Sequence, residues 1–185
     1  MHKVSVFLQP IYTQTISNST TNGIYFNNIP QTFTDIQIRF SVRSLYAGAN
    51  NTAFFYFQDG GNNANYSETY FYGNGSTAGS TRVGTGGVDY GTGIFAIPGN
   101  TTTANTFGSG DIYIPNYAVS GNKHSYIMDI VSENNSATTG IYLELGAGLF
   151  NLTTAITGAG FYLQGGNYFA PNSTFSLYGV LRQGV

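Results

Sequence analysis

The clearest hydrophobic pattern of the chain lies in residues 35–45. Apolar side chains occupy every second position there, at Ile36, Ile38, Phe40 and Val42. This period of two predicts a β-strand with one buried face. A second strand is expected at residues 24–28. It should end before Pro30, because proline cannot donate a hydrogen bond to a sheet.

Two short aromatic runs follow, at residues 53–58 and 66–72. The segment between them contains Asp59-Gly60-Gly61-Asn62-Asn63, and Gly and Asn accept the positive φ angles of tight turns. We therefore predict that the two runs form a β-hairpin. Residues 73–93 contain much Gly, Ser and Thr and few apolar residues, which favours a long surface loop that is available for contacts.

The second half of the chain contains further short runs of β-forming residues separated by Gly or Asn. They lie at residues 93–97, 111–114, 125–131, 140–145, 160–164 and 173–181. Helical spacing is absent, apart from residues 149–156, where a short helix remains open. Roughly eight to ten short strands without helical crossovers predict an all-β fold, a jelly-roll-like antiparallel β-sandwich. We expect an N-terminal arm, residues 1–21, and one sandwich domain, residues 22–185.

The composition is unusual in its lack of charge. Only 8% of the 185 residues are charged, against a typical quarter, and the formal net charge is −2. Soluble monomers usually rely on mixed surface charge to stay dispersed, so a surface this neutral suggests packing in an assembly. A surface solvated by amide and hydroxyl groups is the alternative. Cysteine is absent, which excludes disulfides and thiolate metal sites.

Two classes of partner are not expected. The six Lys and Arg residues are scattered along the chain, so we predict no basic stripe for nucleic acid. No apolar run has the length of a membrane span, and the first residues, MHKVSVFLQP, do not resemble a secretory signal. We therefore expect neither nucleic acid nor membrane as a partner.

Residues suited to catalysis are scarce. The chain has no Cys and only two histidines, His2 and His124, and we interpret His124 as a solvated residue in a turn before a strand. No G-x-S-x-G motif occurs. We predict no catalytic residues and no enzymatic activity.

The eight carboxylates could in principle supply a pair for glycoside cleavage, which requires two facing groups about 5–10 Å apart. The sequence shows no sign of such a pair. Glu68, Asp129 and Glu144 fall inside predicted strands, where alternation would place them toward solvent. Asp59 adjoins Gly60, and Asp89 lies two residues from Gly87 and from Gly91, as turn residues often do.

No metal or cofactor is predicted either. Asp59, Asn62 and Asn63 could suggest calcium, but the terminal Glu of an EF-hand loop is missing. Gly84-x-Gly86-Gly87 does not follow a strand and open a helix, so it does not match a phosphate-binding loop.

Fifteen tyrosines, with no tryptophan, could build a stacking platform for sugars. Tyr66, Tyr70 and Tyr72 share one side of a predicted strand. Packing against the other sheet or a neighbouring subunit is the simpler interpretation of these rings.

Several segments resemble a recurrent family of small bacteriophage virion proteins. They read FNNIPQTFTDIQIRFSVRSL (residues 26–45), NYSETYFYGNGSTAGSTR (65–82), IYIPNYAVSGNK (112–123) and TAITGAGFYLQGGNYFAPNSTFSLYGV (154–180). The resemblance covers most of the chain and consists of turn-and-strand patterns, not of catalytic signatures. It implies a tail, fibre or capsid-associated structural protein.

From this resemblance we expect a capsid cement or decoration protein on the outer surface of a virion. Its expected partners are the major capsid protein and copies of itself, as a homotrimer. Residues 1–21 and 73–93 are the expected contact segments, because arms and strands can add to a neighbour's sheet. No shaft or coiled coil precedes the sandwich, which argues against a tail-fibre tip. A tail-associated module that contacts host glycans is the alternative.

Overall fold

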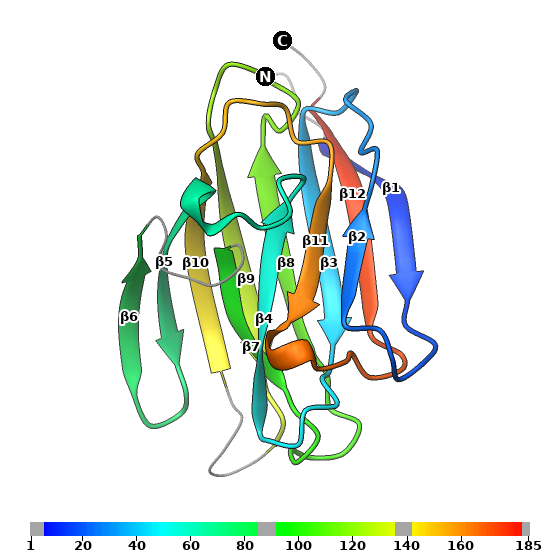
Figure 1. Cartoon of the computed structure of the whole chain (residues 1–185), viewed down its shortest axis with the longest axis vertical. Coiled ribbons are helices and arrows are strands. Elements are labelled where there is room, and N and C mark those ends of the chain that lie inside the picture. Colours follow the sequence, from blue (N-terminus) through cyan, green and yellow to red (C-terminus); the bar gives the residue numbers. More distant parts are fainter. Residues whose placement is uncertain (1–5, 85–91, 136–141, 183–185) are drawn as a thin grey trace.

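The computed structural model describes residues 6–84, 92–135 and 142–182. These residues form two antiparallel β-sheets packed face to face, which confirms the predicted β-sandwich (Figure 1). The jelly-roll description remains a prediction. The strands are β1 (Val6–Thr15), β2 (Gly23–Phe26), β3 (Asp35–Val42), β4 (Asn50–Phe57), β5 (Tyr66–Gly73), β6 (Ala78–Val83), β7 (Thr92–Pro98), β8 (Gly108–Pro115), β9 (His124–Ser132), β10 (Tyr142–Phe150), β11 (Ala159–Leu163) and β12 (Thr174–Arg182).

The two sheets differ in width. The large sheet has eight strands in the order β1-β12-β3-β8-β9-β10-β5-β6, and the small sheet has four in the order β2-β11-β4-β7. In Figure 1 the small sheet lies in front, and β5 and β6 extend beyond its edge. The inner face of the large sheet is therefore only partly covered, and its outer face is not covered by any other described element.

Aromatic side chains fill the space between the sheets. Phe161 of β11 is fully buried, and its ring centroid lies 5.1–5.4 Å from those of Phe40, Phe55 and Phe175. The inward positions of β3, including Ile36 and Phe40, are buried as the period of two predicts. These rings connect both sheets into one hydrophobic core.

The predicted hairpin of residues 53–58 and 66–72 is wrong. β4 belongs to the small sheet and β5 to the large one, and the connection crosses between them through a short 3₁₀ helix, Asn63–Asn65. Tyr66 fixes this crossing, because its buried hydroxyl donates to Asp59 at 2.5 Å and accepts the Phe57 N–H at 2.8 Å. The turn residues predict a reversal of the chain, but they do not say which sheet it enters.

Three other expectations change. Part of the predicted loop 73–93 is strand β6, which pairs with β5, while residues 85–91 lie outside the described part of the chain. Residues 149–156 contain no helix, since β10 continues to Phe150 and an irregular segment follows. Residues 6–15 of the expected N-terminal arm form β1, the edge strand next to β12, and residues 1–5 lie outside the description.

Candidate binding surfaces

Strand β10 has its leucines on the solvent side. Leu143 and Leu145 are 60% and 52% exposed, whereas Glu144, Gly146 and Gly148 point into the sandwich and are buried. The sequence prediction placed the glutamate toward solvent, and this is wrong. An alternating strand shows which residues share a face, but it does not by itself show which face is buried.

The neighbouring strand β9 explains this orientation. A Cβ atom at Gly148 would lie 2.1 Å from Cζ of Tyr126, and one at Gly146 would lie 2.7 Å from Cε of Met128. The large inward side chains of β9 occupy the space above the glycines of β10. Leucines on this inner face would collide with them, so the leucines of β10 face outward.

The outward leucines belong to a larger cluster, which we call the apolar patch. Its members are Phe71 of β5, Ile127 and Val131 of β9, and Leu143, Leu145 and Ala147 of β10. They are adjacent by register, because Leu145 lies opposite Phe71, Leu143 opposite Val131 and Ala147 opposite Ile127. Phe71 and Ile127 are 62% and 54% exposed. Contiguous exposed apolar clusters of this kind mark protein interaction sites.

Comparisons with known family models, curated proteins and solved structures found no match.

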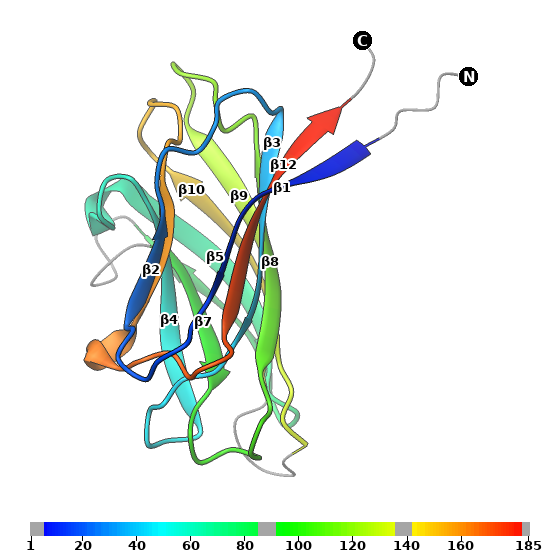
Figure 2. The ribbon, with the colours of Figure 1, turned by 90° about the vertical axis from the view of Figure 1, so that its right-hand side faces the viewer.

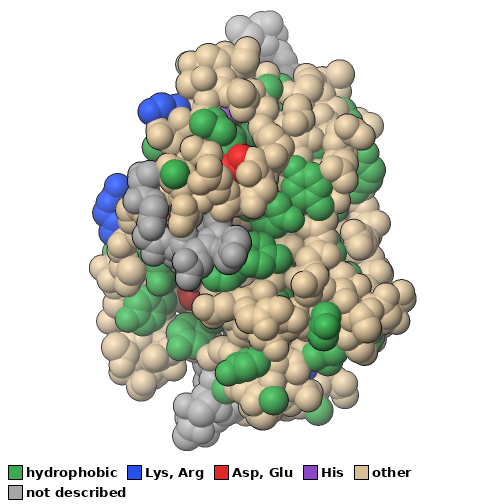
Figure 3. Space-filling model, viewed as in Figure 1, with side chains coloured by type: hydrophobic (Ala, Val, Ile, Leu, Met, Phe, Trp, Pro, Cys, Tyr) green, Lys and Arg blue, Asp and Glu red, His purple; other side chains and the backbone are tan. Residues whose placement is uncertain are grey.

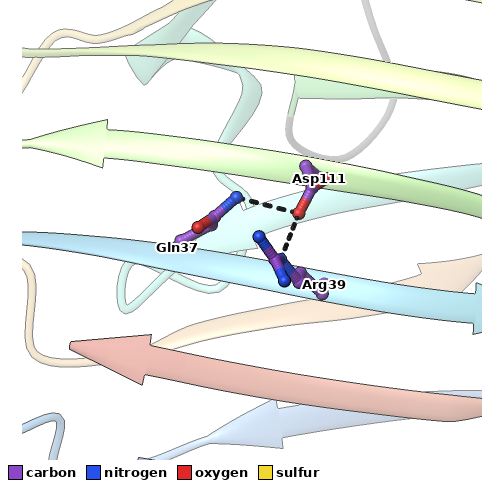
Figure 4. Close-up of polar contacts among 3 residues, drawn as sticks. All are labelled: Gln37, Arg39 and Asp111. Carbon is purple, nitrogen blue, oxygen red and sulfur yellow. Dashed lines mark hydrogen bonds and ion pairs between the residues drawn. The ribbon is translucent and has the colours of Figure 1, made fainter. Parts of the chain in front are cut away.

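Polar residues border the apolar patch on β9, β8 and β3. On β9, the exposed Asp129 lies between Ile127 and Val131 and opposite Leu145. Asp111 accepts hydrogen bonds from Gln37 at 2.9 Å and from Arg39 at 3.0 Å (Figure 4). The Arg39 guanidinium also lies over the ring of Tyr178, 5.6 Å from its centroid. Both members of the ion pair are about half exposed, so the pair contributes little to stability but fixes charged groups at the border. An apolar centre with a polar rim is typical of protein interfaces.

The second exposed feature is the outer end of the β1–β12 pair, residues 6–8 and 180–182, which we call the projecting ribbon. Figure 2 shows it pointing away from the body of the sandwich, on the side of the large sheet. Phe7 lies opposite Leu181 and Leu8 opposite Val180, and Phe7, Leu8 and Leu181 are exposed. Two-stranded ribbons are marginal by themselves, so additional contacts would stabilise this one.

A carboxyl pair lies on the inner face of the large sheet, beside strand β7. Glu68 of β5 and Glu144 of β10 are 1% and 8% exposed, which contradicts their predicted solvent positions. Glu144 accepts the backbone N–H of Ala96 at 2.8 Å, on the edge strand of the small sheet. Burial, together with the nearby charge of Glu68, raises the pKa of Glu144 to about 7. Asp129, by contrast, is exposed on the outer face, as predicted.

This carboxyl pair has a structural explanation. The edge of a sheet presents N–H groups that lack a strand partner, and Glu144 satisfies one of them while joining the two sheets. Tyr70 shares the same inner face, and burial raises its pKa, with the charges of both glutamates contributing. A protonated Glu144 is the form that this environment favours.

His124 is buried, and its interpretation as a solvated residue is wrong. It begins β9 on the inward side, and its Nε2 lies 3.0 Å from the carbonyl oxygen of Thr154. Burial lowers its pKa. The predicted strand begins at residue 125 and leaves His124 in the turn before it. In the structure His124 is the first residue of β9, and the alternation of the strand directs its side chain inward.

The three tyrosines of the predicted platform share one face of β5, as predicted, but they differ in burial. Tyr66 is fully buried in the core, as the simpler interpretation predicts, while Tyr70 and Tyr72 are half-buried near β6. Asp59 and Asn62 accept hydrogen bonds within their own turn. Within residues 6–84, 92–135 and 142–182, no group of three or more His, Asp or Glu residues could hold a metal ion. No helix of this part of the chain is long and apolar enough to cross a membrane.

Proposed function

We propose that the chain is a non-enzymatic structural protein of a bacteriophage virion, a capsid decoration protein that binds the major capsid protein through the apolar patch. The observation that carries this proposal is the outward orientation of the β10 leucines. Leu143, Leu145 and Phe71 are exposed on one face of the large sheet, and an apolar cluster of this kind favours coverage by a partner. The low charge of the chain and its resemblance to phage virion proteins support the same setting.

The proposed mechanism is stabilisation by mass action. A protein that binds the assembled shell and not its separated subunits shifts the equilibrium toward the shell. Many copies of a small interface can then add a large total stabilisation. No reacting group is needed for this role.

The projecting ribbon is the proposed contact between copies of the chain, in a homotrimer on the outer capsid surface. Its apolar side chains are Phe7, Leu8 and Leu181. They lie at the β1 edge of the large sheet, whereas the apolar patch lies toward the opposite edge. One surface can therefore bind the capsid while the other binds neighbouring copies.

Copy number tests the location. Quantitative mass spectrometry of purified virions should find hundreds of copies of this chain per particle. A dozen or so copies would place the protein in a tail and contradict the decoration role. Complete absence from the particle would contradict the virion assignment.

We predict that Leu145→Lys weakens binding to capsids by about 30-fold or more, because loss of a buried apolar anchor at an interface costs about 2 kcal/mol. The introduced lysine would lie opposite Asp129 on β9, so a cross-strand charge pair should preserve the fold. Binding is measured by co-sedimentation of purified protein with capsids stripped of it.

Thr15→Lys is the matched control. Thr15 is exposed on β1, which is the edge strand of the large sheet farthest from β5 and β6. The substitution adds the same charge as Leu145→Lys. It should bind capsids like the unaltered protein. Equal binding by Leu145→Lys and the control would show that the apolar patch is not the capsid contact.

We predict that the double variant Phe7→Ser and Leu181→Ser converts the homotrimer to a monomer, because the two side chains are cross-strand partners and supply apolar area to the ribbon. Sedimentation velocity of the purified protein measures this. The thermal transition of the sandwich should change little, since both positions are exposed. If the double variant is still a trimer, the ribbon is not the contact between copies. If the unaltered protein is already a monomer, the proposed homotrimer is wrong.

A further inference from the structure

The outer face of the small sheet carries a set of aromatic rings that the proposed capsid contact does not use. Tyr25 of β2, Tyr56 of β4 and Tyr162 of β11 come from three adjacent strands, and we call them the tyrosine platform. The ring centroids of Tyr25 and Tyr56 lie 5.6 Å apart with nearly parallel planes, and those of Tyr56 and Tyr162 lie 5.7 Å apart. Figure 3 shows hydrophobic side chains gathered across the middle of this face, with few charged ones.

Glycine makes the platform possible. Gly160 lies between Tyr25 and Tyr56 in the register of the sheet, and a Cβ atom there would lie 2.5 Å from Cδ2 of Tyr25 and 2.8 Å from Cζ of Tyr56. The two rings therefore meet above the backbone of β11. On the next row, the ring of Tyr162 stacks on that of its cross-strand neighbour Phe54, with the centroids 4.9 Å apart. All three rings are held on a rigid sheet.

A groove of about 660 Å³ opens beside these rings. Tyr56 and Tyr162 line it together with two amide side chains, Asn22 and Gln164, and its other lining residues are Phe54, Gly60, Leu163, Gly165 and Gly166. None of the nine is charged. Gly60 and Gly166 have positive φ angles, and a Cβ atom on either would meet no neighbour, so side chains do not close the groove at these points.

We infer that this groove is a binding site for a neutral oligosaccharide. Sugar rings present flat C–H faces that stack on tyrosine, and hydroxyl groups that pair with amides and backbone groups. Both kinds of group line the groove. Its volume lies within the range of ligand sites. The lack of charge in the lining disfavours phosphate and acidic sugars, whose charge would be desolvated without a partner.

The hydroxyl groups of Tyr25 and Tyr56 stay protonated in the neutral range. Burial raises the pKa of Tyr25 and of Tyr56 above the usual value of a tyrosine. Tyr56, which lines the groove, can therefore donate a hydrogen bond to a sugar hydroxyl group throughout the neutral range. The site holds its ligand without cleaving it, since no carboxyl group lines the groove.

An array of neutral and acidic glycans, followed by titration calorimetry with the best neutral oligosaccharide, tests this inference. We expect Tyr162→Ala and Tyr56→Ala to weaken binding at least tenfold. Gln164→Ala should weaken it several-fold and serves as the milder variant, because Gln164 is exposed and does not support the sheet. Tyr178→Ala is the matched control, a half-buried tyrosine on the outer face of the other sheet.

The outcomes separate clearly. The inference is supported if the protein binds neutral glycans, if all three groove variants weaken this binding, and if Tyr178→Ala does not. No binding of any neutral glycan at millimolar concentration would overturn it, as would binding of acidic glycans alone. A concentration-dependent dimer disrupted by Gln164→Ala would show that the groove binds a second copy instead, which also overturns it. The capsid-binding assay with Leu145→Lys is independent of all these results.

Discussion

Phe161→Ala is expected to lower the free energy of unfolding by about 3–5 kcal/mol, because it removes a whole aromatic ring from the middle of the core. Phe161 is fully buried, and the rings of Phe40, Phe55 and Phe175 lie around it. The surrounding rings come from both sheets and cannot collapse into the cavity without moving the strands. For a domain of this size the transition temperature should fall by roughly 6–20 °C.

Chemical denaturation and calorimetry measure this effect. Phe71→Ala is the control, since the same side chain is lost from an exposed position in the apolar patch. It should change the unfolding free energy by less than about 1 kcal/mol. A similar loss of unfolding free energy in both variants would mean that the aromatic core around Phe161 is not the source of stability.

Glu144→Gln is expected to remove a pH dependence of stability that the unaltered protein shows between about pH 4.5 and pH 7. The folded protein holds a proton on Glu144 up to about pH 7, whereas the unfolded chain loses it near 4.5. The native state therefore binds more protons in this window, and its stability falls as the pH rises. The difference in unfolding free energy between the two proteins should change by about 2–3 kcal/mol from pH 5 to pH 8.

The glutamine keeps an oxygen that can accept the Ala96 N–H, so the contact between the sheets should survive. Glu68, Tyr70 and Tyr72 share this inner face and are unchanged in both proteins. His124 contributes a slope of opposite sign below its ordinary pKa, and it cancels in the comparison. Asp129→Asn, at an exposed carboxylate, is the control. Parallel pH profiles for the unaltered protein and Glu144→Gln would contradict the assigned protonation of Glu144.

The sequence predicts elements well where one face is apolar and the other polar. Residues 35–45 and 125–131 satisfy this condition, and β3 and β9 lie there. β6 was missed because Ala78 to Val83 contains almost no apolar side chains, and its pairing with β5 stabilises it instead. β5 lies in a different sheet from β4, and this depends on contacts such as that of Tyr66 with Asp59. No local sequence pattern encodes such contacts.

The candidate surfaces were less predictable than the fold. In β10 the alternation is present in the sequence, but Glu144 suggested the wrong buried face. The signal that could have corrected it is the pair Gly146 and Gly148, because glycines at every second position leave space for large neighbours. The tyrosine platform combines three strands from distant parts of the sequence, so only the sheet order brings it together.

The pairing of β1 with β12 also bears on how the chain folds during synthesis. These strands are separated by most of the sequence, yet each is the other's neighbour in the large sheet. β1 must wait, with its apolar side chains uncovered, until β12 has left the ribosome. Such non-local pairing slows folding and prolongs the exposure of an unpaired strand. In the cell, therefore, the synthesis of β12 controls when β1 is protected from aggregation.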